Sequence, residues 1–265
     1  AALAHFGLID APDAVGRQVS THAELAGALD GAGYVQECGP ETVEAKRALF
    51  AELDAAAGPE AILASSSSGI GASQFTDHLT RPGRCLVAHP VNPPYLIPLV
   101  ELCPGPATDP GAVETARGLM ERVGQAPIVL RKEVRGFALN RLQGALLNEA
   151  LRLYEDGVAS AEDLDRTVKY GLGLRWSFIG PFETIDLNAP GGLQDYARRY
   201  GPLFEALGRE QADARPWSDA TVTALHQERR RLVEQDGLGD RQAWRDRRLM
   251  ALAAHKRAAK RDIGE

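Results

Sequence analysis

The first half of the chain alternates short apolar runs with amphipathic stretches, whereas the second half is amphipathic almost throughout. Short apolar runs bounded by turn residues indicate strands, and apolar positions recurring with a helical period indicate helices. The pattern predicts strands at 16–20, 34–38, 84–91, 97–105 and 126–132, and a strand that runs into a loop at 61–68. It predicts intervening helices at 21–33, 40–58, 71–80 and 108–124. This alternation predicts a parallel or mixed sheet covered by helices.

Polar residues at the expected helix starts refine these boundaries. Thr21 followed by Glu24 has the pattern of a capping box, and Ser160 followed by Asp163 has it again. Asp109 or Thr108 is expected to cap the helix at 108–124, which has a proline in its first turn.

The pattern changes near residues 131–134. A long helix is predicted at 133–157, a further helix opens at Ser160, and strand signals are nearly absent afterwards. We therefore expect an α/β domain at 1–131 and an all-α domain at 132–265.

Composition narrows the class of protein. With 265 residues and 44% hydrophobic content, the chain is long enough for one large or two medium domains. The net charge is −6 and the basic residues are scattered, which argues against a nucleic-acid surface. No apolar run reaches the ~18 residues of a membrane span. Three cysteines without metal-type spacing predict no disulfide framework and no metal site, as in a reducing cytoplasm.

The segment AHPVNPPYLIPLVE, residues 88–101, carries the first candidate chemistry. If its flanking strands are neighbours, His89 and Glu101 can meet at one end of the sheet. A carboxylate on one imidazole nitrogen fixes the tautomer and makes the other nitrogen a better base. The alternative is a core histidine bonded to backbone, with Glu101 at a sheet edge. Spacing alone leaves both interpretations open.

Three other polar positions allow both a functional and a structural interpretation. Ser68 ends a serine run after a predicted strand, where it would bind a substrate oxygen or simply belong to a polar loop. Asn140 lies on the apolar face of its helix and would bond backbone or face a cleft. Arg175, in GLGLRWSFIGPFE, would clamp a substrate carboxylate or be an exposed loop residue.

A glycine-rich dinucleotide turn is missing from the expected place. GAGYVQE is the nearest candidate, but its glycines follow a helix and precede a strand, the reverse of the required order. We interpret them as a helix terminator.

Taken together, these segments resemble the 3-hydroxyacyl-CoA dehydrogenase superfamily, and most of all its short-acid branch of lambda-crystallins or L-gulonate 3-dehydrogenases. The resemblance spans nearly the whole chain and rests on YVQECGPETVEAK, ILASSSSGI, VAHPVNPPYLIPLVEL, EVRGFALNRLQ, GLGLRWSFIGPFETIDLNAPGG and WRDRRLMALAAHK. It implies an α/β Rossmann-like domain, partial in this chain, that binds a dinucleotide, followed by an all-α C-terminal domain for substrate and dimerisation.

The resemblance also implies roles for individual residues. His89 is the catalytic base and Glu101 its partner, while Ser68 and Asn140 bind the reacting substrate oxygen. Arg175 is our own candidate for the substrate carboxylate.

On the cofactor side, the resemblance assigns Glu41 and Lys46 to the nicotinamide-ribose region and Asn92 to the same pocket. It implies NAD as the cofactor, a small hydroxy acid as the substrate and a homodimer formed through the helical domain. Neither nucleic acid nor membrane is an expected partner.

The chain departs from the family pattern at its start. Family members begin with a strand, a G-x-G-x-x-G turn, a helix and an acid-ended strand, and this sequence starts after that unit. We expect the unit to belong to the protein, because His89, Glu101, Ser68 and Asn140 are all intact. Two alternatives stay open: a truncated enzyme that does cofactor-free acid/base chemistry on a 3-oxo acid, and a non-catalytic structural protein.

Overall fold

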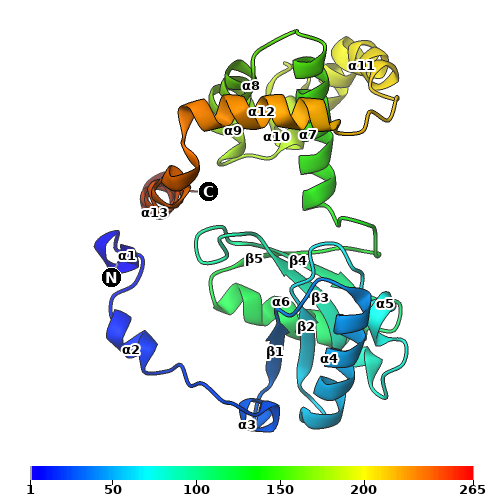
Figure 1. Cartoon of the computed structure of the whole chain (residues 1–265), viewed down its shortest axis with the longest axis vertical. Coiled ribbons are helices and arrows are strands. Elements are labelled where there is room, and N and C mark those ends of the chain that lie inside the picture. Colours follow the sequence, from blue (N-terminus) through cyan, green and yellow to red (C-terminus); the bar gives the residue numbers. More distant parts are fainter. Residues whose placement is uncertain (1, 265) are drawn as a thin grey trace. The chain divides into compact units, whose positions relative to one another are not determined.

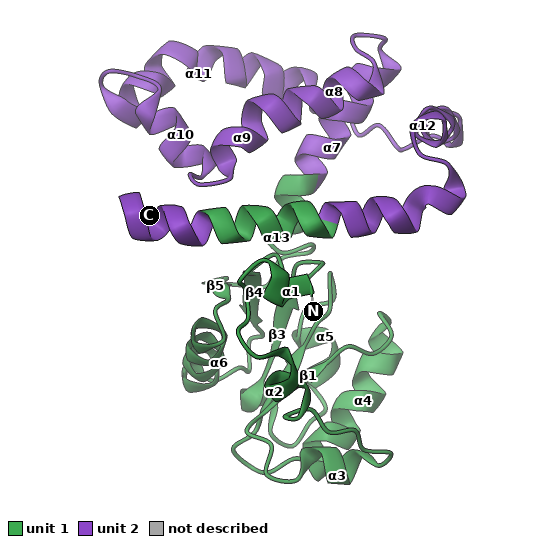
Figure 2. Cartoon of the chain, turned by 90° about the vertical axis from the view of Figure 1, so that its left-hand side faces the viewer, with its two compact units in different colours: residues 1–143, 246–255 green, residues 144–245, 256–265 purple. Residues whose placement is uncertain are grey.

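A computed structural model describes residues 2–264 of the chain, which form two compact units (Figure 2). Unit 1 comprises the described residues up to Gln143 together with Asp246–His255. Unit 2 comprises Gly144–Arg245 and the described residues from Lys256 onward. The boundary predicted near 131–134 lies just before the long helix, whereas the compact units divide inside it.

Unit 1 is built on a five-stranded sheet with the strands in chain order (Figure 1). The strands are β1 (Tyr34–Glu37), β2 (Ile62–Ser65), β3 (Cys85–Pro90), β4 (Leu99–Pro104) and β5 (Ala126–Val129). All neighbouring pairs are parallel except β3 and β4, which run antiparallel. The sheet is therefore mixed, which is one of the two arrangements that the sequence predicts.

Helices cover both faces of this sheet, and strand side chains alternate between them. Leu63, Val87 and Cys103 belong to the buried cluster that contains Phe50 of α4 (Val43–Ala56) and Phe75 of α5 (Ser73–Thr76). The intervening strand residues pack with α6 (Pro110–Arg122) on the opposite face: Ile62, Ala64, Leu86, Ala88, Val100 and Leu102.

The N-terminal stretch departs from the predictions. Residues 16–20 form no strand, because Val19 is 71% exposed and no neighbouring strand covers it. The described segment contains α1 (Ala2–His5), α2 (Pro12–Gly16) and α3 (Leu25–Leu29). The cap of α3 is Glu24, so the capping box proposed at Thr21 is wrong. Residues 21–24 are all exposed, and a helix there would bury no apolar face.

Other boundaries agree with the capping patterns. The Ser160 Oγ accepts the Asp163 N–H at 3.1 Å and donates to the Asp163 Oδ2 at 2.7 Å, which confirms Ser160 as the cap of α8 (Ala161–Thr167). Asp109 is the cap residue of α6, with Pro110 as its first residue. The long helix α7 (Leu139–Glu155) begins six residues later than predicted. Gly136 and Phe137 have φ values of 76° and 50°, and a right-handed helix cannot include them.

The described chain has no strand after Val129, as expected for an all-α second half. Besides α7 and α8, its elements are the π-helix η2 (Val168–Leu172), α9 (Gly173–Trp176), α10 (Pro181–Leu187), α11 (Gly192–Glu210), α12 (Asp219–Leu232), the 3-10 turn η3 (Gln235–Gly237) and α13 (Leu238–Ile263). A further 3-10 turn, η1 (Pro82–Arg84), precedes β3. Throughout the described residues, every helix is too short or too polar to cross a membrane.

Candidate active site

The antiparallel pairing of β3 and β4 brings His89 and Glu101 into direct opposition. The His89 Nδ1 lies 2.9 Å from the Glu101 Oε2, and both side chains are buried. An ionised carboxylate only accepts hydrogen bonds, so the Nδ1 carries the proton that it donates to Glu101. The Nε2 is then the imidazole nitrogen with a free lone pair, which is the arrangement of a general base.

The second oxygen of Glu101 is held by backbone. The Glu101 Oε1 accepts hydrogen bonds from the N–H groups of Ala138 and Leu139, both at 2.9 Å, at the start of α7. These donors stabilise the ionised carboxylate and fix its orientation. The preceding Phe137 is fully buried, and its ring centroid lies 5.6 Å from that of His89. The strained φ of Phe137 is thus offset by burial at the back of the site.

Ser68 and Asn140 also lie together, although not through the serine hydroxyl. The Asn140 Nδ2 donates to the Ser68 backbone oxygen at 2.7 Å. Ser68 is exposed beyond the carboxyl end of β2, and among the described residues its hydroxyl forms no hydrogen bond. The hydroxyl and the second amide N–H of Asn140 therefore remain available to a ligand.

Glu41 holds the loop that carries Ser68. The Glu41 Oε1 accepts hydrogen bonds from the Ser67 Oγ at 2.6 Å, the Ser68 N–H at 2.8 Å and the Gly69 N–H at 3.3 Å. The Glu41 Oε2 accepts none from the described residues. Glu41 and Asn92 are both exposed, and a free carboxylate oxygen and an amide suit ribose hydroxyl and carboxamide groups. These two residues fit the nicotinamide end of NAD.

Lys46 occupies a different environment. It is 1% exposed, and its Nζ lies 2.7 and 2.9 Å from the two carboxylate oxygens of Glu37 and 3.2 Å from the Gly39 carbonyl oxygen. The ammonium has three N–H donors, so these three acceptors account for all of them. The structure therefore places Lys46 in the core beside Glu37, a residue that the sequence interpretation did not single out. The sequence did offer a signal for this pair: Glu37 is an acidic residue at the end of a predicted strand, and Lys46 lies in the helix that follows.

Arg175 belongs to unit 2, where it is an exposed residue of α9. Its guanidinium is free of ion pairs with the described residues.

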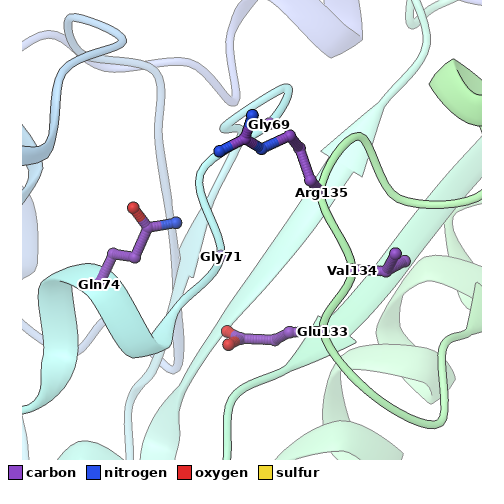
Figure 3. Close-up of a pocket in the computed structure, with 6 residues that line it drawn as sticks. All are labelled: Gly69, Gly71, Gln74, Glu133, Val134 and Arg135. Atoms are coloured by element: carbon purple, nitrogen blue, oxygen red, sulfur yellow. The ribbon is translucent and has the colours of Figure 1, made fainter.

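A cavity of about 140 Å³ lies beside the Ser68 loop (Figure 3). It is lined by Gly69, Gly71, Gln74, Glu133, Val134 and Arg135, and Val134 is its single apolar side chain. The Glu133 Oε1 accepts the Ser73 N–H at 2.8 Å, so this carboxylate is anchored at the start of α5. At Gly71 an added Cβ would come within 2.9 Å of the Glu133 carboxylate, so a larger residue there would require the Glu133 side chain to move. The sequence interpretation missed Gln74, Glu133 and Arg135.

The two buried cysteines, Cys85 and Cys103, offer no competing chemistry at this site. All three cysteines are free, and burial raises the pKa of Cys85 and of Cys103 to about 12. These two thiols are neutral near pH 7 and are poor nucleophiles. Over residues 2–264, no group of three or more His, Cys, Asp or Glu side chains could hold a metal ion.

Comparison with known proteins identifies two family regions. Residues 3–134 match the 3-hydroxyacyl-CoA dehydrogenase NAD-binding domain, and residues 136–233 match the C-terminal domain of the same family. The chain is 48% identical to a lambda-crystallin homolog of Bos taurus over 240 residues, which cover 90% of this chain and 74% of that protein. It is 44% identical to an L-carnitine dehydrogenase of a Pseudomonas species over 175 residues, 66% of this chain and 54% of that one.

Solved structures give the same family likeness. An NAD+-dependent dismutase, 5-formyl-3-hydroxy-2-methylpyridine 4-carboxylic acid 5-dehydrogenase, has a TM-score of 0.78 and 29% identity, with coverage of 95% of this chain and 82% of that one. A 3-hydroxyacyl-CoA dehydrogenase from Archaeoglobus fulgidus has a TM-score of 0.60 and 30% identity, with coverage of 70% and 62%.

Proposed function

Because the chain belongs to the 3-hydroxyacyl-CoA dehydrogenase family, we propose that it oxidises the 3-hydroxyl of a short polar hydroxy acid such as L-gulonate. At the coarser level, the family and its relatives make the chain an NAD-dependent oxidoreductase of hydroxy acids or hydroxyacyl compounds. The observation that carries the proposal is the buried hydrogen bond between His89 and Glu101.

In this proposal His89 is the general base. Its Nε2 takes the proton of the substrate 3-hydroxyl, and Glu101 stabilises the imidazolium that forms. A positioned base of this kind contributes on the order of 10²–10⁴ in rate. Bound NAD would supply the acceptor for the hydride that leaves the substrate carbon. In the reverse direction the imidazolium returns the proton to the oxygen.

Ser68 and Asn140 orient the reacting oxygen in this scheme. The Ser68 hydroxyl and the second Asn140 N–H donate to that oxygen as it gains negative charge. The hydrogen bond between Asn140 and the Ser68 carbonyl keeps the two donors together. Glu41 and Asn92 would hold the nicotinamide end of NAD from the carboxyl ends of the strands, where open α/β sheets bind ligands.

The lining of the cavity next to the Ser68 loop supports a polar substrate. Arg135, Gln74 and Glu133 can pair with a carboxylate or with hydroxyl groups, whereas an alkyl chain would leave them unpaired (Figure 3). One relative is named for L-carnitine, which is itself a short charged 3-hydroxy acid. We keep Arg175 as a further candidate for the substrate carboxylate.

A substrate panel tests this proposal. The complete protein would be given NAD with L-gulonate, L-carnitine, 3-hydroxybutyrate or 3-hydroxybutyryl-CoA, and NADH formation would be followed by absorbance. We expect the highest kcat/KM for the polyhydroxy acid. A higher value for the CoA thioester would overturn the substrate class. Turnover of a 3-oxo acid without any nucleotide would favour cofactor-free chemistry instead.

We also propose that the protein is a homodimer formed through unit 2. Phe178, Phe182 and Leu187, in and beside α10, are 71%, 75% and 69% exposed. On α11, Tyr200 and Phe204 are also about half exposed and stand one turn apart. Apolar side chains in such number favour a protein contact. Sedimentation of the wild type and of Phe182→Ser would test this, and a monomeric wild type would contradict it.

The cytoplasm remains our prediction for the location. The three free thiols support a reducing compartment, because disulfides persist in oxidising ones. Fractionation of the producing cell would test it.

A further inference from the structure

A buried network of charged and polar side chains lies at the carboxyl ends of β1 and β2. It lies against the side of the Ser68 loop that faces away from solvent. Glu37 ends β1 and is 6% exposed. Its Oε1 accepts hydrogen bonds from the Lys46 Nζ and the Ser65 Oγ. Its Oε2 accepts hydrogen bonds from the Lys46 Nζ and the Gly39 N–H, both at 2.9 Å. One carboxylate therefore ties together β1, β2 and α4, which are neighbours in Figure 1.

Two chains of hydrogen bonds lead from Glu37 to the Ser68 loop. In the first, the Ser65 Oγ accepts the Ser67 N–H at 3.1 Å, and the buried Ser67 Oγ accepts the Ile70 N–H at 2.8 Å. Hydrogen bonds from the buried side of the loop thus fix the residues on both sides of Ser68.

The second chain passes through Gly39. Glu37 and Lys46 hold the N–H and the carbonyl of Gly39, two residues before Glu41. The Glu41 carboxylate then accepts the Ser68 N–H at 2.8 Å. The first route ends at Ser67 and Ile70, which flank Ser68, and the second ends at Ser68 itself, the residue that we propose to face the substrate.

Stability alone does not account for this network. A buried ion pair costs desolvation, and a well-packed apolar pair of similar volume is often as stable or more so. Unit 1 contains a second buried pair, in which Asp54 lies 2.8 Å from Arg84, and none of its hydrogen bonds reaches the Ser68 loop. The Glu37 pair differs in that its remaining hydrogen bonds go to the loops that form the site.

We propose that Glu37 is a positioning residue, with Lys46 as its counter-ion, that sets the backbone of residues 65–70 so that Ser68 faces the substrate. This inference rests on the proposed function. Lys46 then contributes through Glu37, because all three of its donors are engaged inside the core.

The test compares two changes in the complete protein. Glu37→Met combined with Lys46→Met replaces the pair by apolar side chains of similar length, while Asp54→Asn alters the other buried pair as a matched control. Melting temperature, kcat with the hydroxy acid and amide hydrogen exchange of residues 66–70 would be measured for each. Because the buried Ser65 hydroxyl and the Gly39 N–H lose their acceptor, we expect the double variant to melt earlier than the wild type. We also expect it to lose at least tenfold in kcat and to exchange faster at 66–70. Asp54→Asn should melt earlier but keep its kcat and its exchange at 66–70.

The outcomes separate the alternatives. A double variant with wild-type kcat and wild-type exchange at 66–70 overturns the proposal. Weaker NADH binding with unchanged exchange at 66–70 also overturns it, since Lys46 would then contact the cofactor directly. If the wild type oxidises no hydroxy acid, the proposed function fails, and the exchange of residues 66–70 alone decides whether Glu37 positions the loop.

Discussion

The Glu101 carboxylate bridges two parts of unit 1 that are distant in the sequence: the His89 imidazole on one oxygen and the start of α7 on the other. His89 and Glu101 are register partners in β3 and β4, so the strand pairing itself sets their separation. The two backbone N–H groups then fix which oxygen faces the ring. The histidine is held in one tautomer by a carboxylate that cannot rotate.

Replacing Glu101 by Gln tests the importance of that tautomer. The amide oxygen of the variant is expected to keep the bonds from Ala138 and Leu139, which turns its NH2 group toward the His89 Nδ1. The ring must then carry its proton on Nε2 and can no longer act as a base. We expect kcat to fall on the order of 10³–10⁴ with little change in melting temperature. A kcat within tenfold of the wild type would contradict the role of Glu101.

Replacing His89 by Ala removes the proposed base itself. We expect oxidation of the hydroxy acid to fall on the order of 10²–10⁴ while circular dichroism shows an intact fold. NADH binding, followed by fluorescence titration, serves as the control and should be preserved. Near-normal turnover in the variant would contradict the assignment of His89 as the general base.

Arg175→Leu tests the proposed contact with the substrate carboxylate. Because Arg175 is exposed in α9, the change should leave the melting temperature unaltered. We expect KM for the acid to rise about tenfold or more, with kcat largely retained, as for the loss of one charge-assisted hydrogen bond. Arg166→Leu, on another exposed part of unit 2, is the matched control. If KM were unchanged, Arg175 would be only a surface residue.

The lowered pKa of Asp54 predicts that part of the free energy of unfolding depends on pH. Burial alone would raise the pKa of Asp54, but hydrogen bonds from Arg84, Thr80 and Arg81 outweigh burial and hold that pKa below its usual value. A depressed folded-state pKa stabilises the protein above the unfolded-state pKa, and this stability is lost as pH falls through the folded-state pKa. Asp54→Asn should cost up to about 3–5 kcal/mol at neutral pH. Urea unfolding at neutral and acidic pH would measure this, and an equal loss at both pH values would refute the argument.

The thiols should differ sharply in reactivity. Cys38 is exposed, whereas burial raises the pKa of Cys85 and Cys103 to about 12. In the native protein a thiol reagent should modify one cysteine quickly and the other two only after unfolding. Cys38→Ser should abolish the fast phase. Two fast thiols in the native protein would show that the core opens more easily than the structure indicates.

The sequence by itself determined a sheet covered by helices, parallel or mixed, and the helical second half; the antiparallel pairing of β3 and β4 came from the structure. Strands β1 to β5 and the capped helices α6 and α8 follow from apolar periodicity and from Asp109 and Ser160, which are local signals. The family motifs also pointed to His89, Glu101, Ser68 and Asn140 as a group. Spacing alone could not decide between a catalytic and a structural histidine.

Only the tertiary structure decided which groups these side chains contact. The second partner of Glu101 is backbone 37 residues further along the chain, and the Asn140 amide bonds a carbonyl 72 residues away. The local sequence pattern would place Lys46 on the surface of a helix, but its side chain is buried in the core, where it pairs with Glu37. The strand predicted at 16–20 does not form, because no distant segment of the described chain covers Val19. Local pattern encodes propensity, whereas burial and hydrogen-bond partners depend on segments that come together only when the chain folds.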